Sequence, residues 1–314
     1  MAMENLIELR GVGKRYGPIA ALHDITVTVP QGQVVGLLGH NGAGKSTLIK
    51  LVLGLIKASD GDLRVLGQAP WGANLGALRR EIGYLPESVA FYRNLTGNEI
   101  IDYFAKLKRA PRRQGRDLLE RVGLKDAANR KVGMYSKGMR QRLGLAQALL
   151  GSPRLVILDE PTTGLDPHAT RDLYSIVDEL RSTGRGVLIS SHLLAELEPH
   201  IDAAVILREG ELLAAGSITD LRCKAGLPSI AKVRLKADAD HPAFAARLAA
   251  ADLDHSSEPD GQISIAMTRS RKVELIRELV SSQSIADLEV EEPTLGRIYE
   301  WLGAGRRSGT ERLL

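Results

Sequence analysis

The residues best suited to chemistry lie in a glycine-rich stretch that follows an apolar segment and ends in Lys45 and Ser46, with the spacing G-x-x-x-x-G-K-S. Glycine tolerates positive φ, so the backbone can turn several N–H groups toward one anion. The lysine would reach the β- and γ-phosphates of a nucleotide, and the serine hydroxyl would ligate Mg²⁺. A plain glycine turn is the alternative, but the Lys-Ser pair at this offset argues against it. The predicted phosphate-binding residues are Gly39, His40, Asn41, Gly42, Ala43, Gly44, Lys45, Ser46 and Thr47.

Two adjacent carboxylates, Asp159 and Glu160, close the continuous apolar run from Leu155 to Leu158. Such a run is typical of a strand buried on both faces of a parallel sheet. Because ligands bind beyond the carboxyl ends of these strands, we expect both carboxylates beside the glycine-rich loop. Asp159 is suited to hold Mg²⁺, and Glu160 to polarise an attacking water. A further buried strand, 186–190, delivers His192 to the same edge.

An α/β fold is needed to position these groups. Residues 34–38 predict an apolar strand before the loop, and residues 48–55 an amphipathic helix after it. Residues 6–10 and 21–29 alternate apolar and polar side chains, which predicts half-buried antiparallel strands. From about 96 to 150 the pattern is helical. The other elements predicted in this part of the chain are strands at 62–66 and 82–87 and a helix at 168–181.

Two weaker signals lie outside this core. Tyr16 stands between the first two strands, where it can stack on a purine base or pack on the surface. Ser136 precedes a helical stretch and is a good N-cap. A helix N-terminus that carries a serine hydroxyl can also bind an anion. Neither signal identifies a ligand alone.

Composition fits an ordinary globular chain and narrows the choice of partner. The 314 residues include 42 basic and 38 acidic ones, a net charge of +4 that is too weak to indicate nucleic acid. The single cysteine, Cys223, excludes an internal disulfide and a cysteine-based metal cluster. No segment reaches the roughly 18 apolar residues that span a bilayer, and the N-terminus shows no signal peptide. We therefore expect a cytosolic protein that reaches a membrane only through a partner.

After residue 228 the pattern restarts and predicts a second, α+β domain. If 253–257 is a strand, the element order is βαββαβ, a ferredoxin-like split unit. We expect an accessory or dimerisation domain at 228–302 and a disordered tail at 303–314. The other predicted elements are strands at 230–236, 262–267 and 285–291 and helices at 241–250, 270–281 and 295–302.

Taken together, the motifs resemble the ATP-binding subunits of ABC transporters over roughly residues 4–225, which sets a nucleotide-binding domain at 4–227. The resemblance implies a P-loop NTPase fold, with a parallel sheet core, an antiparallel β subdomain and a helical subdomain at about 96–150. The motifs occur in the family's order. They are the aromatic loop at Tyr16, Walker A at 39–46, the Q-loop at Glu87, the signature at 136–139, Walker B at 155–160, the D-loop at 164–166 and the switch histidine His192.

The resemblance also assigns roles and ligands. It implies an ATPase that uses ATP and Mg²⁺, with Glu160, His192 and Lys45 as catalytic residues. Tyr16 would stack on adenine, and the metal would be held by Ser46, Asp159 and Glu87. The signature reads Y-S-K-G-M rather than L-S-G-G-Q, and Glu87 stands where most members have glutamine. The further nucleotide-binding residues implied are Glu87, Ser136, Lys137, Gly138 and Met139.

ABC ATPases act as head-to-tail dimers, so the resemblance implies a homodimer around two ATP molecules. Each ATP would lie between Walker A of one chain and the signature of the other. A transmembrane permease dimer would dock beside the Q-loop, where Phe91 and Tyr92 are the expected anchors. Tyr103 and Phe104 can serve there or pack within the helical subdomain. No nucleic-acid partner is expected.

A narrower likeness is to the ATPases of transporters that support copper-site maturation of periplasmic nitrous-oxide reductase. It implies a NosY-like permease dimer with a NosD-like periplasmic subunit, and a place on the cytoplasmic face of the inner membrane. The main alternative is the ATPase of a drug, lipid or polysaccharide exporter. A soluble ABC protein acting on ribosomes or DNA is disfavoured, because those usually carry two cassettes or a long coiled-coil insertion. The segments that carry the narrower likeness are 38–45, 84–87, 91–92, 135–151, 200–202 and 225–228.

Overall fold

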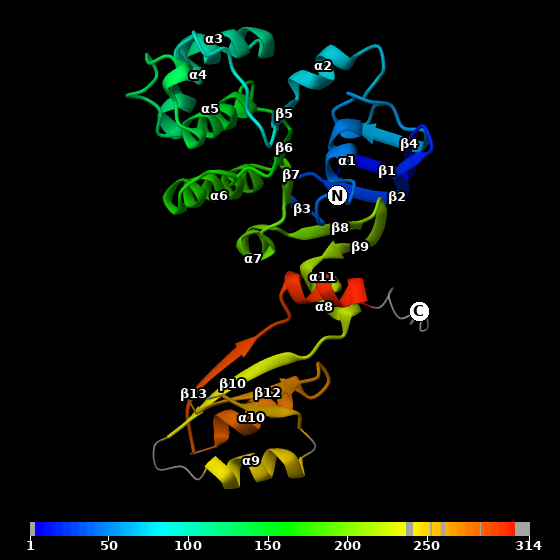
Figure 1. The fold of residues 1–314 in the computed structure, drawn as a ribbon, viewed down its shortest axis with the longest axis vertical. Helices are drawn as coiled ribbons and strands as arrows, with labels where there is room; N and C mark the ends of the chain where they lie inside the picture. The colour runs from blue at the N-terminus through cyan, green and yellow to red at the C-terminus, as the bar shows by residue number, and fades with distance from the viewer. Residues whose placement is uncertain (1–3, 237–240, 252, 259–260, 283, 305–314) are drawn as a thin grey trace. The chain divides into compact units, whose positions relative to one another are not determined.

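The computed structural model describes residues 4–236, 241–251, 253–258, 261–282 and 284–304 (Figure 1). The chain forms two compact units, Met1–Ile218 (unit 1) and Thr219–Leu314 (unit 2). This division falls slightly earlier in the chain than the boundary after residue 227 that the sequence predicts. In the described ranges, no helix has both the length and the apolar character needed to cross a membrane.

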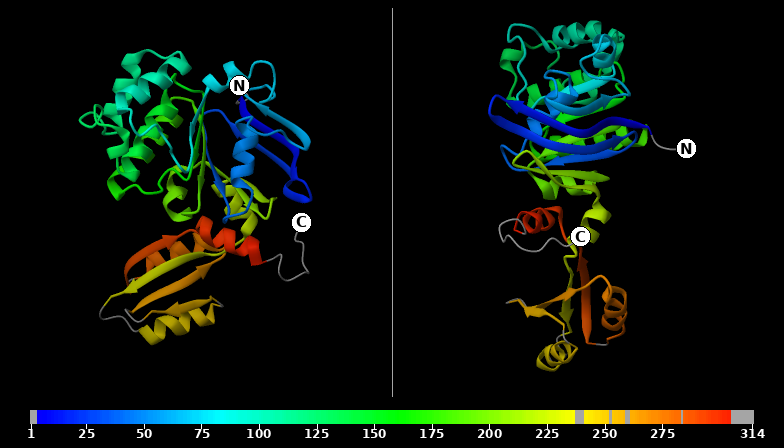
Figure 2. Two further views of the ribbon diagram at one scale, coloured as in Figure 1. Left: turned by 45° about the horizontal axis from the view of Figure 1, so that its top comes forward. Right: turned by 90° about the vertical axis from the view of Figure 1, so that its right-hand side faces the viewer.

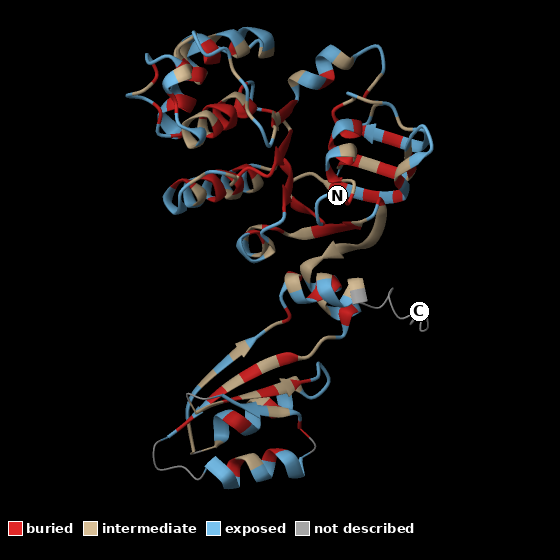
Figure 3. Cartoon of the chain, in the orientation of Figure 1, coloured by how far each residue is buried: buried red, intermediate tan, exposed pale blue. Residues whose placement is uncertain are grey.

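Unit 1 is built on one 9-stranded sheet, ordered β4-β1-β2-β9-β8-β3-β7-β6-β5. Its central strands run parallel, and every residue of β3, β6 and β7 is buried, as expected for strands covered on both faces (Figure 3). The predicted α/β fold with a parallel core is confirmed. The parallel strands are β3 (Val34–Leu38), β5 (Ile82–Leu85), β6 (Leu155–Asp159), β7 (Gly186–Ser191) and β8 (Ala203–Arg208).

The antiparallel part of the sheet contains the predicted pair of half-buried strands. Both are longer than their sequence patterns suggest, so Tyr16 is the last residue of β1 rather than part of a loop. Register shifts along the β1–β2 pair interrupt the alternation of buried and exposed residues, which explains the underestimate. The remaining strands of the sheet are β1 (Asn5–Tyr16), β2 (Ile19–Pro30), β4 (Asp60–Val65) and β9 (Glu211–Ser217).

Helices α3, α4 and α5 group at the β5 end of the sheet and confirm the helical subdomain (Figures 1 and 2). Thr96 and Glu99 form a capping box at the start of α3. Ser136 caps α5 as predicted, because its side chain accepts a hydrogen bond from Met139 N at 3.2 Å. The helices of unit 1 are α1 (Lys45–Val52), α2 (Leu75–Arg80), α3 (Gly97–Lys108), α4 (Arg112–Arg121), α5 (Lys137–Leu149), α6 (Pro167–Ser182) and α7 (Leu194–Leu197).

Unit 2 has the predicted βαββαβ order, with a 4-stranded sheet ordered β11-β12-β10-β13. Phe244 and Leu248 of α9 and Leu275 and Leu279 of α10 pack into its core. The last helix continues to Ala304, past the predicted end at 302, and the rest of the predicted tail lies outside the described residues. The elements, after the preceding α8 (Ile218–Ala225), are β10 (Ser229–Leu235), α9 (His241–Ala250), β11 (His255–Ser257), β12 (Gln262–Met267), α10 (Lys272–Ser281), β13 (Ile285–Glu291) and α11 (Leu295–Ala304).

Candidate functional site

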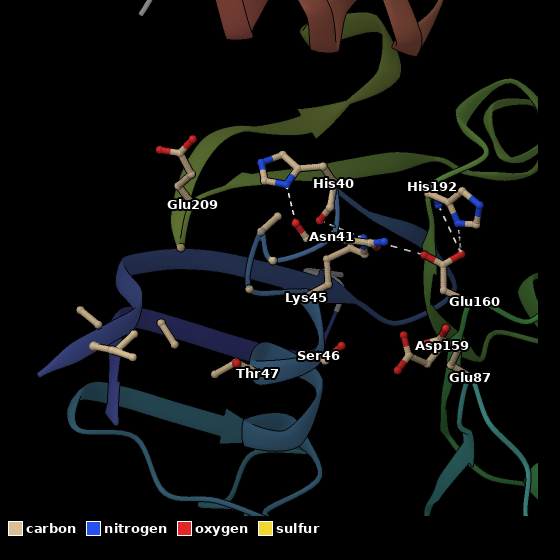
Figure 4. Close-up of a pocket in the computed structure, with 17 residues that line it drawn as sticks. His40, Asn41, Lys45, Ser46, Thr47, Glu87, Asp159, Glu160, His192 and Glu209 are labelled. Atoms are coloured by element: carbon tan, nitrogen blue, oxygen red, sulfur yellow. Dashed lines mark hydrogen bonds and ion pairs between the residues drawn. The ribbon is translucent and has the colours of Figure 1, made fainter. Parts of the chain in front are cut away.

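A cavity of about 670 Å³ opens at the carboxyl ends of the parallel strands of unit 1 (Figure 4). It joins the glycine-rich loop after β3 with side chains at the ends of β5, β6 and β7. The predicted phosphate loop lines it from His40 to Thr47, immediately after Gly39. The lining residues from other segments are Ile19, Ala20, Ala21, Glu87, Asp159, Glu160, His192, Glu209 and Gly210.

The glycines of the loop are required by its backbone shape. Gly39 has a φ of 153°, and a Cβ there would lie 2.5 Å from the carbonyl oxygen of Leu207. Gly44 has a φ of 105° and directly precedes α1, and a Cβ there would lie 2.7 Å from a side-chain carbon of Leu22. A side chain at either position would therefore clash as well as strain the backbone. The loop leads into the N-terminus of α1, which favours an anion.

Lys45 lies inside this loop with its ammonium group held by backbone oxygens. Its Nζ donates to the carbonyl of Gly39 at 2.5 Å and to that of His40 at 3.4 Å. It also lies 3.8 Å from Oε1 of Glu160, and both side chains are only 9% exposed. A phosphate in the cavity would meet this buried positive charge.

Asp159 and Glu160 meet the loop from β6, as predicted. Burial raises the pKa of Asp159, and the negative charges of Glu87 and Glu160 raise it further, whereas the hydrogen bond from Ser190 and the charge of Lys45 oppose them. The ionised carboxylate is therefore short of positive partners in the protein. A bound cation would supply the missing charge.

Glu160 is held in a backbone conformation that is unusual for a residue with a side chain. Its φ is 48°, in the left-handed region. Its Oε2 lies 2.7 Å from Nδ1 of His192, and its Oε1 faces Lys45. The strain fits a functional site, because this conformation aims the carboxylate between the lysine and the histidine (Figure 4).

The oxygen donors predicted for Mg²⁺ fit that ion. Ser46, Asp159 and Glu87 line one cavity, and hydroxyl and carboxylate oxygens are ligands that Mg²⁺ prefers. Mg²⁺ in nucleotide sites is bound by one or two carboxylates together with substrate phosphates. The same carboxylates affect Tyr84. Burial and the negative charges of Asp159 and Glu87 raise the pKa of Tyr84 to about 12.

Five predicted nucleotide-binding residues lie elsewhere on the chain. Tyr16 is 44% exposed at the end of β1 and is absent from the cavity wall, and Nζ of Lys14 lies 5.1 Å from the centre of its ring. The signature residues cap and begin α5, and none of them lines the cavity. These are Ser136, Lys137, Gly138 and Met139.

Sequence reasoning missed two groups of residues that line the cavity and one buried residue that does not. Ile19, Ala20 and Ala21 begin β2, and the backbone of Ala21 lies against Gly44 of the loop and against Gly210. Glu209 and Gly210 form the β8–β9 turn, with φ values of 52° and 81°. The Glu-Gly pair between two apolar runs was the available signal for that turn.

Ser190 is the third omission, and it does not line the cavity. It lies on β7 directly opposite Asp159 of β6 and is fully buried. Its hydroxyl donates to Oδ1 of Asp159 at 2.6 Å and accepts from the backbone N–H of Glu160 at 2.9 Å. Nothing in the sequence pattern distinguishes it from the next residue, Ser191.

A P-loop, two carboxylates and a histidine arranged in this way define a nucleotide-hydrolysing ATPase, and comparison with known proteins identifies its family. The family model for ABC transporters matches residues 22–163. The chain is 31% identical over 306 residues to the linearmycin resistance ATP-binding protein LnrL of Bacillus subtilis, covering 94% of this chain and 97% of that protein. It is 39% identical over 223 residues to the bacitracin transport ATP-binding protein BcrA of Enterococcus faecalis, covering 70% and 72%.

A solved structure gives the same assignment. The structure of an ATP-binding subunit of an ABC transporter matches with a TM-score of 0.67 and 32% identity, over 78% of this chain and 99% of that one. The chain therefore belongs to the ATP-binding proteins of ABC transporters. It is an ATPase of the kind that couples ATP hydrolysis to transport, and proteins of this family bind ATP, normally with Mg²⁺.

Proposed function

We propose that this chain is the ATP-hydrolysing subunit of an exporter that moves an antibiotic or a similar compound. The observation that carries the ATPase role is the single cavity that unites Lys45, Asp159, Glu160 and His192. The exporter type rests on the two named relatives, one a linearmycin resistance protein and one a bacitracin transport protein. The match to LnrL includes most of unit 2 as well as unit 1.

The role in nitrous-oxide reductase maturation, as in NosF, stays a prediction that the reported relatives do not support. The two roles differ in partner and cargo, not in the ATPase chemistry. Co-expression with the permease from the same gene neighbourhood would separate them. Resistance to linearmycin or bacitracin that depends on intact Glu160 supports the exporter. Restoration of a copper-containing nitrous-oxide reductase, without any resistance, would refute it.

The residues of the cavity support a direct hydrolysis mechanism. Phosphoryl transfer to water depends on positioning and on neutralising the charge of the phosphates. Lys45 offsets that charge, and Glu160 orients or deprotonates the attacking water. His192, already hydrogen-bonded to Glu160, contacts the γ-phosphate. Mg²⁺, held by Ser46, Asp159 and Glu87, supplies further charge neutralisation when bound.

Two copies of the chain are needed to complete each site. The signature residues lie outside the cavity formed by Walker A and Walker B. A head-to-tail homodimer would place Ser136 and Gly138 of one copy against the ATP of the other. For unit 2 we propose the accessory role that the sequence predicts, namely stabilising that dimer.

Mixing two inactive chains tests the head-to-tail arrangement. Lys45→Ala disables Walker A and leaves the signature intact, whereas Ser136→Arg does the reverse. Each variant alone should be inactive. An equimolar mixture should regain activity, because one of the two sites in a mixed dimer combines the intact halves. A mixture as inactive as its components, while pull-down through a tag on one variant recovers the other, would refute the arrangement.

A groove on the helical subdomain is the proposed docking site for the permease. It has a volume of about 540 Å³ and is lined mainly by apolar and aromatic side chains. Phe91 and Phe104 meet edge to face with ring centroids 6.1 Å apart, and Tyr92 is 74% exposed at the rim. A partner helix with apolar side chains would be anchored by these rings. The full lining is Ala90, Phe91, Tyr92, Leu95, Ile100, Tyr103 and Phe104.

A double substitution tests this docking site. Phe91→Ala with Tyr92→Ala should weaken co-purification with the permease while leaving the ATPase activity of the isolated chain within about twofold. Leu107→Ala is the matched control, because Leu107 is 56% exposed on α3 but does not line the groove. If the double variant and the control assembled with the permease equally well, the groove would not be the docking site.

A further inference from the structure

The hydroxyl of Ser190 connects the carboxylate of Asp159 to the backbone of Glu160. The hydroxyl proton goes to Oδ1 of Asp159 at 2.6 Å, and a lone pair accepts the N–H of Glu160 at 2.9 Å. The same N–H also lies 3.2 Å from the carbonyl oxygen of Ser190. Ser190 itself is 0% exposed. Both of its bonds therefore form in a site without competing water.

Each bond fixes a different part of the site. The bond to Asp159 occupies one carboxylate oxygen and restricts rotation of the side chain. The other oxygen is left for a cation in the cavity. The bond to the N–H of Glu160 holds that residue at its φ of 48°, a conformation that a glutamate does not keep without surrounding contacts. The orientation of the Glu160 carboxylate toward Lys45 and His192 depends on this backbone conformation.

We infer that Ser190 is a positioning residue for ATP hydrolysis. Its hydroxyl fixes the orientation of both the cation-binding Asp159 and the water-activating Glu160. This inference rests on the proposed roles of Asp159 and Glu160. Ser190 does not line the cavity, so it acts through these two residues and not on the nucleotide. The parallel β6–β7 register, which pairs Asp159 with Ser190, makes this coupling possible.

The adjacent residue provides a matched control. Ser191 is also on β7 and only 2% exposed. Its hydroxyl accepts from the backbone N–H of Leu193 at 2.9 Å and, within the described part of the chain, bonds to neither Asp159 nor Glu160.

 The same Ser→Ala change at the two neighbouring positions therefore removes a hydroxyl of equal size and burial, but only the change at Ser190 removes the link to Asp159 and Glu160.

The first readout is steady-state ATP hydrolysis by the full chain. Ser190→Ala should lower kcat about 10- to 100-fold, the usual effect of losing a group that orients a metal-binding carboxylate, with KM for ATP within about twofold. Ser190→Thr, which keeps the hydroxyl, should recover most of that loss. Ser191→Ala should stay within about threefold of the parent. A Ser190→Ala chain with the parent kcat, or an equal loss in Ser191→Ala, would overturn the inference.

The second readout does not need hydrolysis. In the Glu160→Gln background, the Mg²⁺ concentration at which ATP raises the melting temperature reports how well Asp159 is positioned. Adding Ser190→Ala should raise that midpoint about tenfold or more, while stabilisation by ATP in EDTA stays unchanged. An unchanged midpoint, or an equal loss of ATP binding in EDTA, would overturn the role of Ser190. Hydrolysis by Glu160→Gln at the parent rate would instead refute the proposed role of Glu160, so the two failures are distinguishable.

Discussion

Glu160→Gln is the substitution that most directly tests the proposed chemistry. Glutamine has nearly the same shape, so it can fill the same space between Lys45 and His192 without the negative charge. The lost carboxylate is the only group assigned to orient or deprotonate water. We expect hydrolysis to collapse while ATP binding and dimer formation remain.

The size of the effect follows from the contacts of the carboxylate. A general base contributes about 10²- to 10⁴-fold to a rate, which corresponds to about 3–5 kcal/mol of activation free energy. The affinity for ATP should not fall with the hydrolysis rate. Oε1 of Glu160 lies 3.8 Å from Nζ of Lys45, a gross attraction of about 4 kcal/mol at an effective dielectric constant of about 20, most of it offset by desolvation. The substitution releases Lys45 and removes a charge that repels the γ-phosphate, so ATP should bind at least as tightly.

The assay is phosphate release from ATP by the purified full chain, together with light scattering to follow the ATP-dependent dimer. Glu120→Gln is the control, because it makes the same change on the surface of α4, where Glu120 pairs with Lys125. The control should match the parent in both measurements. Hydrolysis by Glu160→Gln within about twofold of the parent rate would show that Glu160 is not the group that activates water.

Three further changes have expected outcomes. Asp159→Asn should raise the melting temperature of the nucleotide-free chain at neutral pH. Burial raises the pKa of Asp159, so the folded state resists its ionisation. This cost is absent below the ordinary pKa and fully present above the raised one, so melting curves should show a smaller gain at pH 4 than at pH 7. The variant should also lose Mg²⁺-dependent stabilisation by ATP. Gly39→Ala should abolish ATP binding measured by calorimetry, because its Cβ would lie 2.5 Å from the carbonyl of Leu207, and parent-like affinity would contradict the loop geometry. Tyr16→Ala should weaken ATP binding about fivefold or more if the ring stacks on adenine, and should leave it unchanged if Tyr16 only packs on the surface.

The chemistry of the site was predictable because its signals are local. The phosphate loop needs glycine at positions of positive φ and a lysine and a serine at fixed offsets, and contiguous residues meet those needs. Asp159 and Glu160 were identified because a strand buried on both faces must be apolar throughout and must deliver its next residues to the ligand edge. Element order in unit 2 was also readable, because its helices and strands have clear periods.

Local signals did not predict the full length of β1 or the place of the β8–β9 turn beside the cavity. Register shifts between β1 and β2 blur the alternation of side chains, so Tyr16 was assigned to a loop instead of a strand. Glu209 reaches the cavity only because β8 and β9 pair beside β3 in the sheet. These positions depend on strand pairing between distant segments, which a local pattern does not encode.

By itself, then, the sequence determined which groups are suited to bind phosphate, hold a cation and activate water. The tertiary structure decided which groups meet: that Glu160 lies between Lys45 and His192, that the signature stays outside the cavity, and that Ser190 rather than Ser191 links the Asp159 carboxylate to the backbone of Glu160. The physical reason is the parallel register of β6 and β7. A shift of one residue would turn Ser190 away from Asp159 and bring a different side chain to the site.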